Sequence, residues 1–468
     1  MPSRCIVVMG AGVAGLSAAL LLARDGHRVT VLERDGFDVG SSEDATRWRR
    51  QGIPHFLQPH ALIPRARVEL MRNLPDVYAT LVEAGARDVD LRRKLPGTPG
   101  PQDEDLQYLA VRRPLIEWAL RRAVSGEALI EVRAAAQLTG LQVEGGRVLG
   151  VRVGGTAVSA DLVVDALGRR TPSGRWLAED SVASAHIETS DCGVIYYSRY
   201  YQVRPGCELP DGPWLLSPRG DLGYFGFASF PGDNGTFAAL LAVPAGVPAW
   251  RAFKDADVFD AAVAQIPALR AWVDPDLVDP ITAVMAMAGL RNTLRDPDSA
   301  TVGGLAPVGD AYSHSDPVLA HGLAFALVHA GALASGLREH VDLGDALASY
   351  LAATGPALRE RYDLATALDD QRHRLWLGEP MDVAHRDGDY ALFSMTAAGA
   401  AATQDAEIFR AFVRRIGLLD STQVLDRDIN LQGRIEDLFA QIRTVPRPAS
   451  GPSREDMLAL ATAGTSHI

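Results

Sequence analysis

The sequence predicts an α/β protein (an α+β composite) with a parallel-sheet domain, an antiparallel sheet and a helical C-terminal region. Three observations support this prediction. The chain opens with a complete strand–turn–helix–strand unit within residues 6–33, residues 193–243 are rich in aromatic and strand-forming residues, and the pattern from residue 320 onward is mostly helical. A chain of 468 residues has room for two or three domains, at roughly 100–200 residues each.

The opening unit is visible in the hydrophobic pattern. An apolar run at residues 6–9 is typical of a buried parallel strand, and residues 29–32 predict a second strand. Between them, residues 16–24 are strong helix formers, and Gly26 can end this helix as a C-cap. The first strand, the helix and the second strand therefore begin a parallel sheet.

The turn between the first strand and the helix carries a glycine triplet at Gly10, Gly12 and Gly15. The first glycine permits a tight turn, the second leaves room for a pyrophosphate, and the third lets the helix pack close to the strand. The helix N-terminus at Val13 and Ala14 offers unpaired N–H groups and a partial positive charge to phosphates. We therefore predict a dinucleotide site here. A purely structural glycine turn is the alternative.

Glu33 ends the second strand, where an acidic side chain can accept hydrogen bonds from an adenosine ribose. An acid at this position, rather than an arginine, favours an unphosphorylated ribose. The residues by themselves therefore favour FAD or NAD over NADP.

The rest of the chain continues the alternation of helices and strands. A hairpin signal, Pro-Gly-Asp-Asn-Gly at residues 231–235, divides the aromatic-rich region into antiparallel strands. The other predicted elements are helices over 61–94, a helix begun at Pro114, alternating strands over 129–165, and a strand ending at Gly309-Asp310.

Composition narrows the functional classes. The net charge is −12 and no Lys/Arg block interrupts it, which argues against nucleic acid and anionic membrane surfaces as partners. No run of about 18 apolar residues is present, so we expect no membrane span. Three cysteines without a Cys-x-x-Cys pair, and no signal peptide, predict a reduced, cytoplasmic protein. The histidine spacings do not resemble a metal site.

Further motifs carry a family resemblance. "DLVVDALGRR" (161–170) is a strand ending in Asp-x-x-Gly, and "VRRPLIEWAL" (111–120) puts an arginine before a helix. "LAPVGDAYSHSDPVLAHGLAFALVHA" (305–330) places Gly-Asp at a strand end, then a proline, then a glycine that opens a small-residue helix. With the opening unit, these motifs resemble the FAD-dependent monooxygenase superfamily. It includes aromatic hydroxylases, squalene-type and polyether epoxidases, and flavin halogenases. "RQGIPHFLQPHAL" (50–62) is similar to a segment of the epoxidase-like branch.

The resemblance, which covers roughly residues 4–340, implies a domain organisation. Residues 1–180 and 285–345 would form a Rossmann-type FAD-binding domain, and residues 181–284 an antiparallel β-sheet substrate domain. Residues 346–468 would form a helical C-terminal region without a recognisable motif.

The resemblance also implies which residues hold FAD, although a turn or helix cap is the alternative for the aspartate at position 310. The implied cofactor residues are Gly10, Gly12, Val13, Ala14 and Gly15 at the pyrophosphate, Glu33 and Arg34 at the ribose, Arg50 and Arg113 at the pyrophosphate or ribityl chain, Leu138 near the adenine, Asp310 at the ribityl or pyrophosphate oxygens, and Pro317, Gly322 and Leu323 at the flavin.

Two departures from the family pattern concern the electron donor and the reaction. Ala320 replaces a glycine just before the helix that Gly322 opens. The family's Asp-Gly motif reads Asp165-Ala-Leu-Gly168 here. In many single-component hydroxylases that motif helps to bind NADPH. We therefore expect either NADPH or NADH to act directly or a separate flavin reductase to supply electrons. The missing Trp-x-Trp-x-Ile-Pro signature argues against halogenation.

The family chemistry implies a monooxygenase, either a hydroxylase or an epoxidase. A flavin C4a-hydroperoxide would insert one oxygen atom from O2 into a bulky aromatic or alkene small molecule, by analogy in natural-product tailoring. His321 and His55 are the candidate catalytic residues, because histidine can move a proton at neutral pH. His60 and His314 fall in neighbouring segments, and for each histidine a structural role is the alternative. Two other classes stay open: an FAD-dependent dehydrogenase or reductase of the same fold, and a non-catalytic flavin-binding protein.

Overall fold

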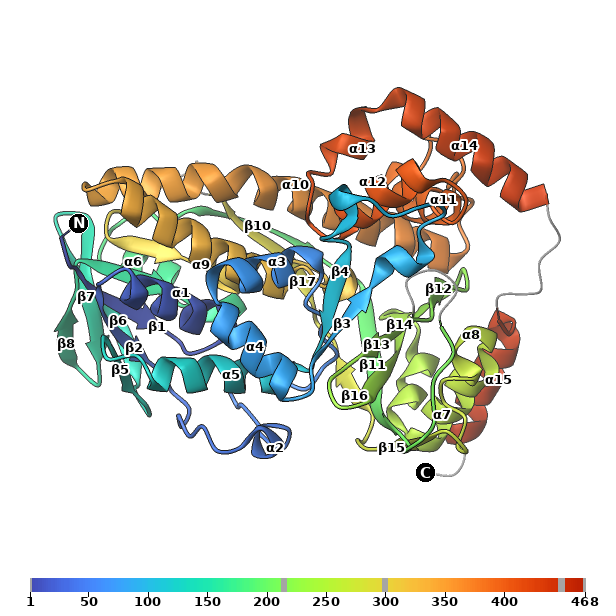
Figure 1. Cartoon of the computed structure of the whole chain (residues 1–468), viewed down its shortest axis with the longest axis horizontal. Coiled ribbons are helices and arrows are strands. Elements are labelled where there is room, and N and C mark those ends of the chain that lie inside the picture. The colour runs from blue at the N-terminus through green and yellow to red at the C-terminus, as the bar shows by residue number, and fades with distance from the viewer. Residues whose placement is uncertain (1, 212–216, 297–301, 445–450, 466–468) are drawn as a thin grey trace.

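The molecule has two sheet-containing halves and a helical layer (Figure 1). The structure is a computed structural model that describes residues 2–211, 217–296, 302–444 and 451–465. In the view of Figure 1 the parallel sheet lies on the left, the larger antiparallel sheet at the lower right, and most of the C-terminal helices at the upper right. This arrangement agrees with the predicted α/β composite and its helical C-terminal region.

The N-terminal half is built on a five-stranded parallel sheet with the strand order β18–β9–β1–β2–β5. Its strands are β1 (Cys5–Met9), β2 (Arg28–Leu32), β5 (Ile130–Arg133), β9 (Leu162–Asp165) and β18 (Leu305–Pro307). The prediction of a parallel sheet that begins with the opening unit is confirmed. Because β18 comes from a segment remote in sequence, the domain is discontinuous.

The helix of the opening unit, α1 (Val13–Arg24), contacts α5 (Arg113–Ser125) and α9 (Gly322–Glu339). Every residue from Gly15 to Ala23 is buried. A helix that is apolar around its whole circumference must be covered on all sides. Here the parallel sheet and the neighbouring helices provide that cover. Helix α3 (Pro64–Asn73) packs against α9 on the same side.

A three-stranded antiparallel sheet covers the other face of the parallel sheet. Its strands are β6 (Leu138–Glu144), β7 (Arg147–Val153) and β8 (Thr156–Ser159). Side chains alternate across β1, so Ile6 and Val8 join the core under the helices while Val7 and Met9 join the core under β6–β8. The β6–β7 and β7–β8 turns are Gly-Gly pairs with positive φ at both residues, which two-residue hairpins of this kind require.

The second half contains a six-stranded antiparallel sheet in the order β12–β13–β14–β11–β15, with β16 also paired to β11. These strands are β11 (Val194–Val203), β12 (Arg219–Asp221), β13 (Gly226–Pro231), β14 (Thr236–Pro244), β15 (Val278–Pro280) and β16 (Met285–Met287). All nine residues of β14 are buried, because both faces of the sheet are covered. Helix α7 (Ala256–Gln265) packs below one face with Phe253 and Trp250.

A small sheet links the two halves. It consists of β10 (His186–Asp191), β17 (Arg291–Asp296) and β19 (Ser313–His314), all antiparallel. The remaining short elements are α2 (Ser42–Ala45), α4 (Pro75–Glu83), β3 (Arg87–Asp90), β4 (Gln107–Ala110), α6 (Ser173–Glu179) and α8 (Pro267–Arg270). The prediction that residues 61–94 are entirely helical was wrong at β3. Gly85, with φ +103°, follows α4, and β4 then supplies an antiparallel partner.

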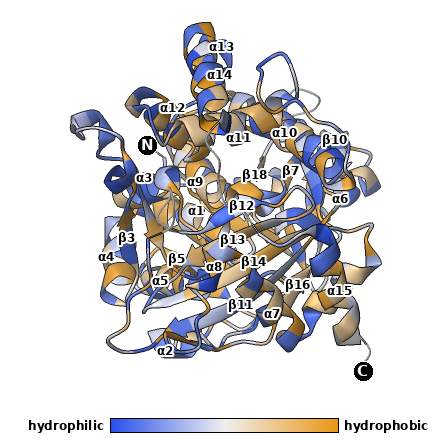
Figure 2. Ribbon diagram, turned by 90° about the vertical axis from the view of Figure 1, so that its right-hand side faces the viewer, coloured by the Kyte–Doolittle hydropathy of each residue, from blue (hydrophilic) through white to orange (hydrophobic). Residues whose placement is uncertain are grey.

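The C-terminal region is helical, as predicted. Helix α10 (Leu343–Leu377) spans 35 residues and runs along the top of Figure 1 toward the other helices. These are α11 (Tyr390–Ala401), α12 (Ala406–Ile416), α13 (Gln423–Arg427), α14 (Ile429–Thr444) and α15 (Arg454–Thr465). Helix α14 shows hydrophobic and hydrophilic colours along its length in Figure 2, and its buried apolar residues recur every three or four positions.

The last helix, α15, leaves this layer and packs against α7 (Figure 1). Met457 and Ala461 of α15 belong to the same apolar core as Phe259 of α7. The predicted region 346–468 therefore contributes to two separate cores. Among the described residues, no helix combines the length and apolar character needed to cross a membrane.

Candidate functional site

A cavity of about 650 Å³ extends from the carboxyl ends of the parallel strands to the antiparallel sheet. One end is lined by the glycine turn after β1 and by Glu33 after β2. The other end is lined by Phe230 of β13, Met287 of β16 and Leu290. Its size falls within the usual range of small-molecule sites, roughly 300–1,000 Å³. Open α/β sheets bind ligands at this edge.

The three glycines of the turn have different surroundings. A Cβ atom on Gly10, whose φ is +102°, would lie 2.7 Å from the carbonyl oxygen of Ala166. A Cβ atom on Gly15 would lie 2.0 Å from the carbonyl oxygen of Gly10. At Gly12 the nearest such atom is Nη2 of Arg113, at 4.0 Å, so a side chain there would enter the cavity. Two glycines therefore serve the protein's own packing, and the third keeps the cavity open.

Two helix N-termini meet the cavity without a side-chain cap. Helix α1 begins after Gly12, and helix α9 begins at Gly322. Val13, Ala14 and Leu323 of these first turns also line the cavity. Uncapped helix N-termini offer free N–H groups and a partial positive charge. They are suited to a pyrophosphate and to the electron-rich edge of a flavin.

Asp310 lies between these helices, in a 3-10 turn over Gly309–Ala311. Its carboxylate lines the cavity and accepts no hydrogen bond from the described part of the chain. A Cβ atom on Gly322 would lie 3.7 Å from its Oδ1. The turn is held from behind, because the Gly309 N–H donates to Nδ1 of His329 (2.9 Å). This free acceptor favours a ligand role over the turn-cap alternative.

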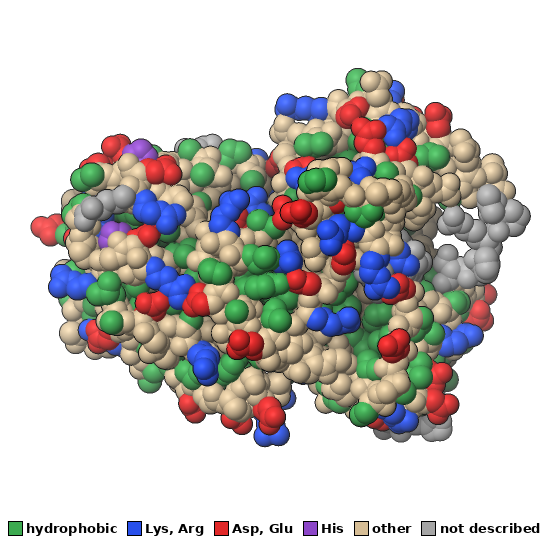
Figure 3. All heavy atoms as spheres, in the orientation of Figure 1, with side chains coloured by type: hydrophobic (Ala, Val, Ile, Leu, Met, Phe, Trp, Pro, Cys, Tyr) green, Lys and Arg blue, Asp and Glu red, His purple; other side chains and the backbone are tan. Residues whose placement is uncertain are grey.

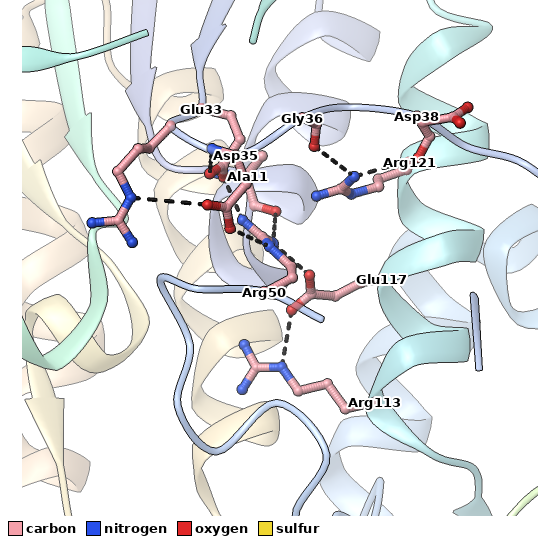
Figure 4. Close-up of polar contacts among 10 residues, drawn as sticks. Ala11, Glu33, Asp35, Gly36, Asp38, Arg50, Arg113, Glu117 and Arg121 are labelled. Carbon is pink, nitrogen blue, oxygen red and sulfur yellow. Dashed lines mark hydrogen bonds and ion pairs between the residues drawn. The ribbon is translucent and has the colours of Figure 1, made fainter. Parts of the chain in front are cut away.

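A buried ion-pair network holds the acid after β2 (Figure 4). Glu33 is 5% exposed, and its Oε2 accepts from the Ala11 N–H (2.8 Å) and from Nη2 of Arg50 (2.6 Å). Its Oε1 accepts from the Asp35 N–H (2.8 Å). Arg50 also donates to Oε2 of Glu117 (2.5 Å) and Oδ2 of Asp35 (3.1 Å). The carboxylate of Glu33 therefore has a fixed orientation at the cavity wall.

Glu117 connects this network to a second arginine (Figure 4). It is fully buried on α5, and its Oε1 accepts from Nε of Arg113, one turn earlier, at 2.9 Å. Burial raises the pKa of Glu117, but Arg113 and Arg50 lower it more, so the net pKa lies below its usual value. Burial likewise opposes the charge of Arg50, yet Glu117 and Glu33 hold its pKa above the usual value. The sequence analysis missed Glu117, although a charged residue on an apolar helix four positions after an arginine is a usable signal.

The remaining predicted cofactor residues lie along the same cavity. Leu138 begins β6 and lines it, and Arg34, whose side chain is 65% exposed, lines it at the rim. Pro317 begins a 3-10 turn at the opposite side and also lines it. The structure thus brings all the predicted cofactor-binding residues except Gly15, which packs behind Gly10, to one cavity.

The structure divides the candidate histidines into those that line the cavity and one that does not. His55, His60 and His314 line the cavity, whereas His321 does not. The buried ring of His321 instead places Nε2 3.2 Å from the carbonyl oxygen of Ile416, at the end of α12. Because this side chain is directed at the helical layer, its placement does not favour the proton-transfer role suggested by the sequence.

The cavity-lining histidines lie in a positive environment. Burial, then Arg113 and Arg169, lower the pKa of His55 well below its usual range. Burial, and to a lesser extent the charge of Arg113, lowers the pKa of His60 to about 3. The hydrogen bond between Nδ1 of His60 and the Gln58 carbonyl oxygen (2.7 Å) raises the pKa, but by less. Both rings are therefore neutral at pH 7.

Three further cavity residues, Leu358, Arg361 and Tyr362, come from α10, outside the motif-bearing part of the chain. Arg361 of α10 lines the cavity and donates to the carbonyl oxygens of Arg415 (3.1 Å) and Asp420 (2.9 Å). Burial, then the charge of Arg415, lowers its pKa to about 10. Nothing in the local sequence indicates this position, because α10 reaches the cavity only through the tertiary fold.

Comparisons with known proteins agree with this geometry. Residues 5–169 match the family model described as FAD dependent oxidoreductase. Protein Rv3254 of Mycobacterium tuberculosis (strain ATCC 25618 / H37Rv) is 26% identical over 465 residues, covering 90% of each chain. PqsL, a probable FAD-dependent monooxygenase from Pseudomonas aeruginosa, has a TM-score of 0.57 at 18% identity and covers 81% of this chain and 99% of its own. The myxobacterial chondrochloren halogenase CndH has a TM-score of 0.58 at 19% identity and covers 96% and 99%.

These findings confirm the resemblance predicted from the motifs. Residues 5–169 are similar to an FAD-dependent oxidoreductase domain, and the chain shares its fold with solved structures described as a probable FAD-dependent monooxygenase and an FAD-dependent halogenase. The residues at the glycine turn fit that cofactor: Gly12 leaves the cavity open, two uncapped helix N-termini face it, and the carboxylate of Asp310 is free to accept a hydrogen bond.

Proposed function

We propose that this protein is an FAD-dependent monooxygenase, a hydroxylase or epoxidase that inserts one oxygen atom from O2 into a bulky aromatic or alkene substrate. One observation carries the proposal. A single cavity joins the glycine turn and both uncapped helix N-termini to an apolar wall of Phe230, Met287 and Leu290. A substrate at this wall would share one enclosed space with the cofactor. By analogy, the substrate is a natural product under construction.

The chain's own residues bind and orient the cofactor. The α1 N-terminus and Arg113 hold the pyrophosphate, Glu33 the ribose, and the carboxylate of Asp310 the ribityl hydroxyls. The α9 N-terminus at Gly322 faces the flavin and stabilises negative charge on the reduced ring. Bound FAD supplies electron storage, oxygen activation and oxygen transfer.

The substrate end of the cavity has an apolar wall and a histidine, His55. Phe230 and Met287 provide an apolar wall, and Ser198 behind it donates to Oε1 of Gln58 (2.8 Å), so this polar pair is already satisfied. His55 is neutral at pH 7 and lines the cavity. Because its pKa lies well below the usual range, this ring is a weak base, so it would orient a substrate hydroxyl through a hydrogen bond rather than take up its proton. We retain His55, and not His321, as the catalytic candidate.

The electron donor is NADH or NADPH, acting directly or through a flavin reductase. The test is a set of anaerobic reductions of the FAD-loaded protein, followed by flavin absorbance. One sample receives NADH alone, a second NADPH alone, and a third NADH with an added flavin reductase. Bleaching only in the third sample assigns a two-component system. Bleaching in the first or second assigns direct reduction and names the preferred nucleotide.

Reaction of the reduced protein with oxygen tests the oxygenase proposal. FAD-loaded protein, reduced anaerobically, is mixed with O2 in a stopped-flow instrument and then with a panel of naphthols and aryl alkenes under ¹⁸O2. Multiphasic reoxidation and ¹⁸O in a product support a monooxygenase. Reoxidation in one phase, with no labelled product, contradicts it and favours the dehydrogenase alternative. Protein that binds FAD but cycles with no donor would be a flavin-binding protein without turnover.

A further inference from the structure

A second cavity, of about 400 Å³, adjoins the first one at His55, Arg169 and His314. It lies between the 3-10 turn Gly168–Arg170 that follows β9 and the linking sheet of β10 and β17. Four arginines line it: Arg169, Arg170, Arg291 and Arg295. Among the described residues of its wall there is no acidic side chain. For a chain with net charge −12, such a local excess of positive charge is an exception.

Strand geometry directs part of this charge inward. Arg291, Thr293 and Arg295 alternate along β17 and therefore share one face of the strand. The intervening Asn292 and Leu294 are buried on the opposite side, where Nδ2 of Asn292 donates to Asp369 of α10 (2.8 Å). The backbone of β17 is held by pairing with both β10 and β19. The two arginines are thus presented to the cavity by a fixed strand.

Arg295 is the most informative of the four arginines. Its Nη1 is buried and has no hydrogen-bond partner among the residues that the structure describes. Burial lowers the pKa of this side chain, against the charges of Asp165 and Asp310, which raise it. A buried donor without an acceptor is costly, and more so when the group is charged. Such a group at a cavity wall is suited to a ligand that supplies the acceptor.

His55, at the junction of the two cavities, gives an independent observation. Nη1 of Arg113 lies 3.1 Å from its Nε2, and Nη2 of Arg169 contacts its Nδ1. A neutral imidazole has one N–H donor and one acceptor, whereas a guanidinium only donates. One of the two arginines therefore faces an N–H group. In the tautomer that carries its proton on Nδ1, this is Arg169, and an anion beside Arg169 would provide the acceptor that His55 cannot.

We propose that the second cavity is an oxyanion subsite, which binds a carboxylate or phosphate group of the small molecule that approaches the flavin. The inference rests on the proposed function for its meaning and narrows the substrate class to acids or phosphorylated molecules. A carboxylate fits a guanidinium through two parallel hydrogen bonds, and a phosphate can bridge several arginines. The same chemistry occurs on a substrate acid and on the phosphate of NADPH.

The test measures anion binding to the FAD-loaded protein without turnover, by calorimetry and by the flavin difference spectrum. Inorganic pyrophosphate is the first probe, at low salt. Two further probes distinguish the sources: 1-naphthoate represents an aromatic acid, and adenosine 2′,5′-bisphosphate represents NADPH. We expect pyrophosphate to bind, and we expect added salt to weaken this binding. We also expect pyrophosphate to compete with one of the two organic probes. The competing probe names the source of the anion.

Three variants localise the binding. Arg295→Gln should weaken it at least tenfold, and Arg295→Lys should retain part of it. Arg147→Gln, an exposed arginine on β7, is the matched control and should bind as the unchanged protein does. The visible spectrum of bound FAD verifies that each variant is folded.

Three results would overturn the proposal: no anion binds to the FAD-loaded protein, Arg295→Gln binds as tightly, or anions bind only before FAD is added. The last would assign the arginines to the FAD pyrophosphate. Because binding is read without catalysis, anion binding by a protein that fails to oxygenate contradicts only the proposed function.

Discussion

Ala320 illustrates how one residue records a departure from a family pattern. It lies just before α9 with φ +55° and ψ 28°, the left-handed conformation that glycine adopts without strain. The sequence motif has a glycine here in the monooxygenase family. A left-handed alanine costs about 1–2 kcal/mol. The chain bears this strain next to a cavity-lining helix N-terminus.

We expect Ala320→Gly to raise the free energy of unfolding by up to about 1 kcal/mol, after the entropy that glycine adds to the unfolded chain is subtracted. Urea unfolding of the FAD-loaded protein measures it. Ala353→Gly is the control, because Ala353 is exposed within the regular helix α10. This variant should lower the free energy of unfolding by about 1 kcal/mol. Equal losses in both variants would show that Ala320 is not strained.

Glu117 is the residue with the largest expected electrostatic effect. Because it is buried between Arg50 and Arg113, Glu117→Gln should lower the free energy of unfolding by about 3–5 kcal/mol at pH 7 and weaken FAD binding. Glu131→Gln removes an exposed pair with Arg133 and should cost less than about 1 kcal/mol. Chemical unfolding of both variants makes the comparison.

The pH dependence of this effect has a definite sign. The folded-state pKa of Glu117 lies below its usual value of 4.5, so its stabilising contribution is present above that value. The contribution is lost as the pH falls through the folded-state pKa. The stability difference between the unchanged protein and Glu117→Gln should therefore shrink as the pH is lowered from 7 through 4.5 and below. A difference that stays constant would contradict the ion-pair assignment.

The turn between β1 and α1 shows how an element divides work among similar residues. Gly12→Ala should leave the unliganded fold intact, since the nearest atom to the added Cβ is 4.0 Å away, but should weaken FAD binding at least about tenfold. Gly15→Ala should instead destabilise the fold, because its Cβ would lie 2.0 Å from the Gly10 carbonyl oxygen. FAD titration and thermal unfolding separate the two effects. Identical behaviour of the two variants would contradict this division.

Elements with strong local patterns were predictable. The opening strand, the buried helix α1 and the helix begun near Pro114 follow from hydrophobic period, glycine spacing and the preference of proline for the first helical turn. Strand β3 was missed, because it exists only through its pairing with β4. The sequence also did not indicate that the ring of His321 contacts the Ile416 carbonyl instead of lining the cavity, since side-chain direction at a helix start depends on neighbouring elements.

At the scale of the molecule, the chain's end is tied to its second sheet. Met457 of α15 is fully buried with Phe259, and the hydroxyl of Tyr224 donates to the carbonyl oxygen of Pro452 (2.7 Å). Met457→Ala should lower the free energy of unfolding by about 2–5 kcal/mol while FAD affinity is unchanged. Arg454→Ala, at an exposed position of the same helix, should be neutral. A loss of FAD affinity in Met457→Ala would indicate coupling between α15 and the cofactor cavity.

The charged side chains that Figure 3 shows on the molecular surface form no pattern that indicates a function. On the face shown in Figure 3, acidic and basic side chains are interspersed. The four arginines around the second cavity are the local exception: Arg169 and Arg295 are partly buried, whereas Arg170 and Arg291 are exposed.

The sequence by itself determined the parallel sheet, the glycine turn and the cavity-lining residues of the opening unit, because these depend on local period and on spacings within one supersecondary unit. Only the tertiary structure decided that Glu117 bridges Arg50 and Arg113, that His321 faces α12, and that Arg295 enters a second cavity. The physical reason is the same in each case. Burial and charge depend on partners far apart along the chain, and no local pattern encodes which partners meet.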